Sequence, residues 1–464
     1  MEKRGYNHII LISLDSLRLD AISSLCKTKF IKKYSSSKSY NTSILDDIIK
    51  NGTVFLNCIS AAPYTSASHA AYFTGCWPRN NGIYEFYNRK IQKKTIFEIA
   101  KGQGFTTIFQ TDFPIILGKT LGLTNGVDNY FIEEEHSALN HLIKNKTKKT
   151  LSFFHFAGIH YPYGFHKLKF GGENYLNKVK LLEKEFSLNS LCEPKDILDE
   201  AIRDKKDKDL LFRYKQIIEF LYSSSNYSRL YNLYLEGIEF FLKNRFNKFI
   251  KEVIDFVDKE NALLVIFSDH GENWDKSSKG HSNTISDAVL RVPLIFYGRN
   301  IPSNKRINKL VRTIDLFPTI CKLADLKHAH IDGSPINSFD KNEETKRHAI
   351  AQVWRVGDKT KVYNHQKQMM ESNKYVKPLK TTLEKEALYL DKYILNRFHF
   401  KDFSHDKFYI NNPPKIKLIP KKPTKINQIN KLLSDYNKIN KKNGKINSIR
   451  KEIAEGLNLL GYRI

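Results

Sequence analysis

A carboxylate and an imidazole stand side by side after an apolar run near residue 270. The residues LLVIFS lead directly into Asp269-His270-Gly271-Glu272. Asp and His both bind divalent cations, and Gly271 allows the chain to turn sharply where the run ends. Asp15 follows another apolar run near the N-terminus. Asp15, Asp269 and His270 together would offer oxygen and nitrogen donors, which favours zinc or manganese, while calcium is also compatible.

A threonine is the candidate nucleophile. Thr65 precedes SASHAAYFTG, an Ala-rich stretch that predicts a helix. Backbone N–H groups at the start of a helix favour an anionic substrate group. A threonine hydroxyl is a weak nucleophile unless a base or a metal activates it, and the metal set could do so. The alternative is that Thr65 only caps the helix, and the two interpretations are compatible.

The elements that must position these side chains are strands and helices in alternation. Short apolar runs predict buried strands, with helical patterns between them, at His8–Leu14, 53–59, 105–110, 151–157, 262–267 and 293–297. This alternation predicts an α/β fold with a doubly wound, mostly parallel sheet flanked by helices, followed by a small α+β C-terminal part. Chemistry in such sheets lies at the carboxyl ends of strands, where the segments of Asp15, His160 and Asp269 fall.

Composition limits the class of protein. Hydrophobic residues make up 41% of the 464 residues, which excludes global disorder. The net charge of +27 attracts nucleic acid, acidic lipids, or phosphorylated and sulfated substrates. No nucleic-acid module is recognisable, so we expect no specific nucleic-acid partner. Five scattered cysteines indicate separate thiols in a cytosolic protein. No apolar run suits a signal peptide or a membrane span, so a cytoplasmic protein is expected.

Three regions are expected along the chain: a catalytic α/β domain over 1–340, a subdomain over 341–410 and a basic tail over 411–464. The tail holds 13 Lys and Arg against 3 acids and is rich in Lys, Asn and Ile. A solvated helix or a partly ordered tail is the favoured interpretation. The alternative is an arm that docks peripherally on a membrane surface or an anionic polymer.

Six segments, in order, carry a resemblance to the sulfatase-like branch of the alkaline phosphatase superfamily. They are IILISLDSLRLD, YTSASHAAYFTG, HYPY at 160–163, VIFSDHGE, GHS and RVPLIFYG. Each is short, but their shared order over roughly residues 6–340 is a strong combined signal. The resemblance implies a metal-dependent hydrolase or transferase with the α/β fold described above.

The nucleophile segment departs from that of true sulfatases. Those enzymes have Cys or Ser, which is converted to formylglycine, at the position of Thr65, and Pro and Arg at those of Ala67 and His69. Threonine cannot give the same aldehyde. A threonine here is instead similar to the phosphoglycerol and phosphoethanolamine transferases of bacterial envelopes, which use a metal-bound Thr and a covalent phospho-enzyme.

The resemblance implies roles for individual residues. The metal would be held by Asp15, Thr65, Asp269 and His270. The phosphoryl oxygens or the leaving group would be served by His160 and His281.

The remaining candidates are less specific. Ser68 and His69 are expected to bind substrate. Ser16 stands where sulfatases often have a second Asp, which points away from their calcium site. We interpret His155 and His166, which flank the 160–163 loop, as structural.

Three hypotheses for function follow. The first is metal-dependent phosphoester transfer or hydrolysis through a covalent phosphothreonine. The residues do not name its substrate, and only the resemblance implies a phosphorylated envelope glycan or its donor. The second is sulfate-ester hydrolysis without formylglycine. A nonenzymatic anion-binding protein is the third, motivated by the charge alone. The expected partner is therefore an anionic phosphoester or sulfate ester.

Overall fold

The computed structural model describes most of the chain. The described residues are 5–26, 40–85, 89–165, 175–185, 205–275, 278–337, 347–356, 359–372, 376–390, 393–399, 404–412 and 415–419, together with single positions including 167, 187, 339, 427, 430, 431, 433 and 434. His166, Cys192 and residues 435–464 lie outside this part, so the interpretations of His166 and of the basic tail are not addressed by it.

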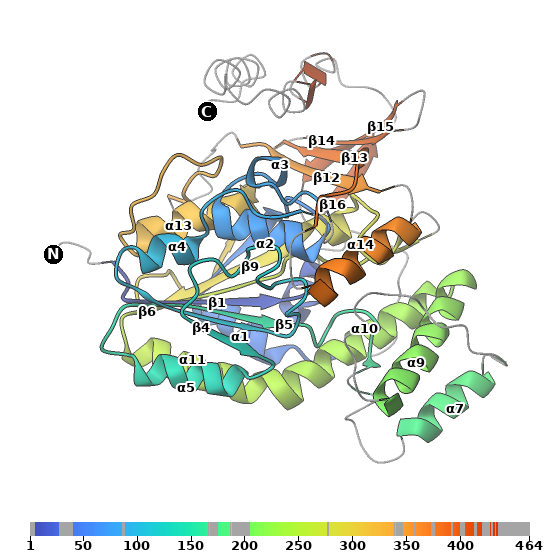
Figure 1. The fold of residues 1–464 in the computed structure, drawn as a ribbon, viewed down its shortest axis with the longest axis horizontal. Coiled ribbons are helices and arrows are strands. Elements are labelled where there is room, and N and C mark those ends of the chain that lie inside the picture. Colours follow the sequence, from blue (N-terminus) through green and yellow to red (C-terminus); the bar gives the residue numbers. More distant parts are fainter. Residues whose placement is uncertain are drawn as a thin grey trace.

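A nine-stranded sheet forms the centre of the described chain (Figure 1). Eight strands follow one another across it in the order β10 (Lys305–Ile307), β2 (Thr53–Ile59), β9 (Arg291–Gly298), β6 (Ala262–Phe267), β1 (His8–Leu14), β5 (Thr150–Phe156), β3 (Thr106–Thr111) and β4 (Asn129–Ile132), and β11 (Val311–Arg312) pairs with β2. All pairings are parallel except those of β9, which is antiparallel to both β2 and β6. The expected mostly parallel sheet is therefore confirmed.

Strand β1 explains why both faces of the sheet are covered. Its alternate residues enter two separate hydrophobic cores, with Ile9 and Leu11 in one and Ile10 and Ile12 in the other. This division follows from the period of two along a strand, in a run that is apolar at nearly every position. Strand β1 therefore contributes to a hydrophobic core on each face of the sheet, as the expected doubly wound arrangement requires.

Helices cover each face (Figure 1). The first core receives α2 (Thr65–Thr74), α4 (Ile96–Lys101) and α13 (Leu316–Leu323). The second receives α1 (Ser43–Asn51), α5 (Glu135–Lys144), α10 (Tyr227–Phe241) and α11 (Asn247–Lys259). A π-helical turn, Leu242–Phe246, joins α10 to α11. Short elements near the sheet are α3 (Pro78–Asn81), α12 (Asp287–Leu290), β7 (Trp274–Asp275) and β8 (Ser278–Lys279), and two further helices, α7 (Tyr175–Glu185) and α9 (Lys205–Ser223), precede α10.

A second, antiparallel sheet follows the central domain. It comprises β12 (Ala349–Arg355), β13 (Thr382–Tyr389), β14 (Tyr393–His399), β15 (Ser404–Asn412) and β16 (Lys415–Ile419), with α14 (Lys359–Ser372) between the first two strands. The boundary expected at residue 410 falls inside β15, and residues 415–419 form a strand rather than the expected helix. The reason is that β15 and β16 pair, Phe408 opposite Ile419, so the basic composition is compatible with an edge of the sheet.

The two sheets share one core. Ile350, Tyr389 and Leu395 of the second sheet belong to the same buried cluster as Phe317 of α13. Nearby, the carboxylate of Asp315 is buried between the guanidinium groups of Arg312 and Arg347. The pKa of Asp315 is lowered, because the two arginines outweigh the effect of burial, which alone would raise it.

Two further observations concern the chain as a whole. Among the described residues, no helix combines the length and the apolar character needed to cross a membrane. Four cysteines in the described part are free thiols, namely Cys26, Cys58, Cys76 and Cys321.

Candidate active site

The carboxyl ends of β1 and β6 bring the two aspartates together. These strands are paired in parallel, with Ser13 opposite Phe267, so Asp15 and Asp269 leave the same edge of the sheet. The side chains of Asp15, Asp269 and His270 are fully buried, and one ligand atom from each lies within 4.8 Å of the others. Three of the four residues expected to hold a metal therefore converge.

Hydrogen bonding sets the orientation of His270. Its Nδ1 lies 3.0 Å from the carbonyl oxygen of Gly271 and must donate to it. Its Nε2 is therefore the lone-pair atom, and it faces Oδ2 of Asp269 at 3.3 Å and Oδ1 of Asp15 at 3.8 Å. A backbone carbonyl that fixes the tautomer of an imidazole in this way is typical of metal-binding histidines.

The donor set fits a divalent cation. Oδ2 of Asp269 is buried and has no hydrogen-bond partner among the described residues. A buried carboxylate oxygen without a partner is costly, and a cation bound between it, Asp15 and His270 would remove that cost. Two carboxylates and one imidazole suit a borderline cation.

Ser16 ties the two carboxylates to each other. Its N–H donates to Oδ1 of Asp269 at 3.2 Å, and its hydroxyl donates to Oδ1 of Asp15 at 2.9 Å. The residue has φ 64°, a left-handed conformation that is rare outside glycine. Tyr234 from α10 donates its hydroxyl to the carbonyl oxygen of Ser16 at 2.8 Å, which helps to hold this conformation.

Thr65 is the first residue of α2. Its N-cap is Tyr64, whose side chain makes no capping hydrogen bond. Oγ1 of Thr65 lies 3.2 Å from Nε2 of His270, which accepts its proton in a hydrogen bond. The hydroxyl thus points at the atoms expected to bind the metal, and the first-turn N–H groups of α2 lie beside it.

Gly271 is required where β6 turns away. A Cβ at this position would lie 2.0 Å from the carbonyl oxygen of Ala288. The N–H of Gly271 donates to the oxygen of Val289 at 2.7 Å. This close backbone approach fixes the segment that carries Asp269 and His270.

Ser68 and His69 lie beneath the site with no exposed surface. Ser68 donates to the carbonyl oxygen of Asp269 at 2.7 Å, and Nδ1 of His69 donates to that of Thr65 at 2.7 Å. Nε2 of His69 accepts from the hydroxyl of Ser13 at 2.9 Å. Burial lowers the pKa of His69 to about 4, against a smaller opposing effect of Asp269, so the ring is neutral. In this structure both side chains support the nucleophile and the ligands from below.

His160 and His281 lie on the other side of His270. The rings of His281 and His270 are stacked with centroids 3.9 Å apart, and His160 is 5.2 Å from His281. Nδ1 of His160 donates to the carbonyl oxygen of Tyr161 at 2.9 Å, so Nε2 is the atom that can reach a substrate. The site thus gathers six of the eight residues predicted from the sequence around one point, with Ser68 and His69 behind them.

Two further residues contact the site. Nε2 of His155 donates to Oδ2 of Asp15 at 3.1 Å, and Glu272 accepts from Nδ1 of His281 at 3.1 Å. For Glu272 the available signal was its place in the segment DHGE. For His155 the sequence held no such signal, because its position opposite Ser13 is set by the pairing of β5 with β1. His155 is structural in the sense expected, but the group it holds is a candidate metal ligand.

The histidines keep Asp15 ionised. Burial alone would raise the pKa of this carboxyl group, but His160, the hydrogen bond from His155 and the nearby His270 lower it well below its ordinary value. An ionised Asp15 is the form that can bind a cation.

The fold and this cluster define an α/β enzyme whose site lies at the strand ends. Residues 7–326 match the Sulfatase family, and the chain belongs to that family. It is accordingly a hydrolase or transferase of the alkaline phosphatase superfamily.

Two relatives that are similar in sequence carry names that refer to different reactions of sulfate groups. The chain is 21% identical over 363 residues to the low-salt glycan biosynthesis sulfotransferase Agl7 of Haloferax volcanii, which covers 75% of this chain and 68% of that protein. It is 23% identical over 130 residues to a sulfatase of Formosa agariphila, covering 28% of this chain and 25% of that one.

Solved structures share the fold. BT4656 in complex with its substrate D-glucosamine-2-N,6-O-disulfate superposes with a TM-score of 0.65 at 16% identity, over 96% of this chain and 100% of that one. The phosphonate monoester hydrolase of Agrobacterium radiobacter gives 0.60 at 13% identity, over 92% and 95%. The fold therefore serves both sulfate and phosphonate esters.

Proposed function

We propose that the chain transfers or hydrolyses a phosphoester through a covalent phosphothreonine at Thr65. One observation carries the proposal: Oγ1 of Thr65 lies 3.2 Å from Nε2 of His270, the atom that also faces Asp15 and Asp269. A hydroxyl aimed at three prospective ligand atoms is placed to be activated as a nucleophile.

The proposed cofactor is one divalent cation, with zinc or manganese favoured and calcium compatible. Asp15, Thr65, Asp269 and His270 would hold it, which fits the unpartnered Oδ2 of Asp269. When bound, the ion would favour the alkoxide form of Thr65 and offset negative charge on the ester oxygens.

The reaction needs two displacements at phosphorus. Thr65, having lost its proton to solvent, forms an O–P bond as the bond to the leaving oxygen breaks. That oxygen receives a proton from Nε2 of His160 or His281, which acts in its imidazolium form. In the second displacement the same imidazole takes a proton from water or an acceptor hydroxyl, whose oxygen attacks phosphorus and releases Thr65, which then regains a proton.

The relatives and the charge support the proposed substrate class. The names of relatives refer to a glycan and to sulfate or phosphonate esters, and the chain carries a net charge of +27. We propose an anionic ester on a glycan, with a phosphorylated envelope glycan or its donor as the specific candidate.

Sulfate-ester chemistry is the second candidate. It is favoured by the sulfotransferase and sulfatase names among the relatives. Threonine is a secondary alcohol, so its oxidation would give a ketone and not the formylglycine aldehyde. Any sulfate transfer by this chain would therefore need the hydroxyl of Thr65 itself, or a route without a covalent intermediate.

Labelling of the intact protein tests the proposal. The purified chain is incubated with zinc, manganese or calcium and with aryl phosphomonoesters, phosphodiesters and sulfates. Because phospho and sulfo adducts have nearly the same mass, the donor carries radioactive phosphorus or sulfur. We expect phosphorus label on Thr65 that depends on the metal, is lost in the isosteric Thr65→Val and is partly kept in Thr65→Ser. Sulfur label alone would favour the second candidate, and full turnover by Thr65→Val would refute both covalent routes.

A further inference from the structure

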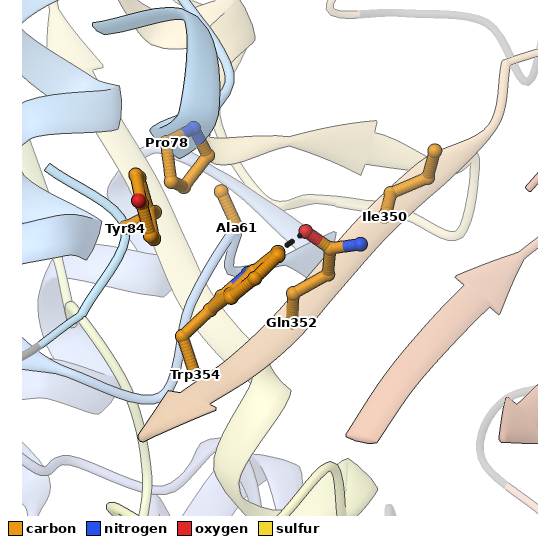
Figure 2. Close-up of a pocket in the computed structure, with 6 residues that line it drawn as sticks. All are labelled: Ala61, Pro78, Tyr84, Ile350, Gln352 and Trp354. Atoms are coloured by element: carbon orange, nitrogen blue, oxygen red, sulfur yellow. Dashed lines mark hydrogen bonds between the residues drawn. The ribbon is translucent and has the colours of Figure 1, made fainter. Parts of the chain in front are cut away.

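An aromatic surface borders the proposed active site at the second sheet. Figure 2 shows Tyr84, from the loop after α3, facing Trp354 of β12 across a shallow hollow lined also by Pro78 and Ala61. The two rings meet edge to face with centroids 5.1 Å apart, and both side chains are partly exposed. We call Tyr84, Trp354, Arg79 and Arg89 the Tyr84–Trp354 surface.

Hydrogen bonds hold Trp354 in place. Its indole Nε1 donates to Oε1 of Gln352 at 3.0 Å, and Nε2 of Gln352 donates to Glu386 at 3.1 Å. The chain of bonds fixes both the ring and the amide, so a ligand would meet a surface that is already ordered.

Two guanidinium groups rest on these rings. Cζ of Arg79 lies 4.7 Å from the ring centroid of Trp354, and Cζ of Arg89 lies 4.2 Å from that of Tyr84. A guanidinium that is stacked on a ring can also form two parallel hydrogen bonds to an anion through its N–H edge.

Arg89 also has unused hydrogen-bonding capacity. Its Nε is buried and makes no hydrogen bond to any described residue. Such a donor is costly to leave unpaired, and a movement of the side chain toward an anion would allow it to pair.

The acids of β13 near this surface are occupied elsewhere. Glu384 lies 3.6 Å from Arg355, and Glu386 accepts from Gln352. They therefore reduce the positive potential of the surface but have partners of their own.

Two contacts join the surface to the reaction centre. Tyr64, which immediately precedes Thr65, donates its hydroxyl to the carbonyl oxygen of Trp354 at 2.9 Å. Lys385 of β13 donates to the carbonyl oxygen of Asn283, two residues after His281. The side chain of Tyr64 thus links the residue next to the nucleophile directly to the backbone of Trp354.

We propose that the Tyr84–Trp354 surface binds a second anionic group, sulfate, phosphate or carboxylate, on a glycan whose ester is held at Thr65. The inference rests on the proposed function for the position of the ester. The stacked arginines would bind the anionic group, and the ring edges of Tyr84 and Trp354 would contact the sugar. A glycan with one anionic group would use only the Thr65 site.

Calorimetric titration tests this binding directly. Every chain carries Thr65→Ala so that no turnover consumes the ligand. The probes are a sulfated heparin tetrasaccharide, a phosphorylated mannose oligosaccharide, and the heparin tetrasaccharide after desulfation. The test variant replaces Arg79 and Arg89 together with Gln. The control variant replaces Arg299 and Arg306 together with Gln, which removes the same charge from two exposed arginines.

We expect the first pair to weaken binding of one or both anionic probes about tenfold and the control pair less than about twofold. The desulfated probe keeps its carboxylates, so it should be unaffected if the surface binds sulfate or phosphate and weakened about as much as the sulfated probe if it binds carboxylate. Which anionic probe responds identifies the group that is bound. Equal weakening by both pairs would show binding by overall charge alone and would overturn the proposal. If replacing Arg79 and Arg89 with Gln lowers the unfolding midpoint, both are replaced with Lys instead. Lysine keeps the charge but cannot form the paired hydrogen bonds, so this variant must still weaken binding. Aryl-ester turnover by the wild-type chain reports on the proposed function separately, so either idea can fail alone.

Discussion

Nδ1 of His281 lies 3.1 Å from Oε1 and 3.2 Å from Oε2 of Glu272, a carboxylate with no exposed surface. The carboxylate accepts a hydrogen bond from the Nδ1–H group, which leaves Nε2 of His281 as the atom that can contact a substrate. Burial alone would raise the pKa of Glu272, but His281, His270 and Tyr163 outweigh it and lower that pKa. An ionised Glu272 therefore holds the ring that stacks on His270.

Replacing Glu272 with Gln tests this relationship. The amide keeps the shape but can no longer accept the Nδ1 proton with a charged group, so we expect kcat to fall about 10- to 100-fold with KM little changed. Steady-state kinetics on an aryl ester and calorimetric titration of manganese are the measurements. Glu371→Gln, on the exposed face of α14, is the control. A matching fall in metal affinity would mean that Glu272 acts through His270 instead.

Metal binding should raise the stability of the chain. Zinc or manganese at roughly 100 times its dissociation constant is expected to add about 2.7 kcal/mol to the free energy of unfolding. Differential scanning calorimetry with and without a chelator measures the shift. Asp269→Asn should abolish it, whereas Asp255→Asn, an exposed acid of α11 paired with Lys259, should leave it intact. An undiminished shift in Asp269→Asn would place the ion elsewhere.

The amino end of β1 provides a pH-dependent contribution to stability. His8 is buried, its Nδ1 lies 2.9 Å from Oγ1 of Thr150, and its ring packs against Phe256. Burial lowers the pKa of His8 more than Glu260 raises it. The folded state therefore binds this proton less readily than the unfolded state, whose histidine pKa is about 6.5.

Stability should accordingly fall as the pH drops below about 6.5, since the unfolded chain then takes up a proton that folded His8 resists. Urea unfolding at a series of pH values gives the free energy. In His8→Gln the decline should be shallower than in the wild type, and in His328→Gln, an exposed position, it should be unchanged. Parallel declines in His8→Gln and the wild type would contradict this assignment.

Gly271 should tolerate no side chain. Because a Cβ would meet the oxygen of Ala288 at 2.0 Å, Gly271→Ala is expected to lower the free energy of unfolding by about 1–3 kcal/mol and to displace His270. Gly102→Ala, with φ −62° and its nearest contact at 3.2 Å, should change stability by less than about 1 kcal/mol. Chemical denaturation and turnover are measured together. An alanine at 271 without effect on either would show that the turn can relax.

The strands of the core could be predicted closely. The runs at His8–Leu14, 53–59 and 262–267 became β1, β2 and β6 with the same bounds, because a fully buried parallel strand is apolar at nearly every position. The antiparallel direction of β9 could not be read from its sequence, since an apolar run carries no direction. The five-stranded second sheet was expected only as a small α+β part, because its strands pair with one another rather than with the main sheet.

The site residues could be predicted where the candidate ligands or the nucleophile lie within one short segment of the sequence. The segment around Asp269 and His270 and the threonine before the helix were recognisable from residue type and order. The contact between His155 and Asp15 was not, because it depends on the register of β5 against β1. Likewise, the burial of His69 follows from how α2 packs, which its sequence does not specify.

The core shared by the two sheets has a consequence for how the protein is made. Leu395 and Leu433 join the same buried cluster as Phe55 of β2, and Arg347 joins Asp315. During synthesis these late residues leave the ribosome only after the nucleophile and all the candidate ligands are already exposed. The earlier part keeps an open apolar face until then, so the core can close only after the second sheet and Leu433 have been synthesised.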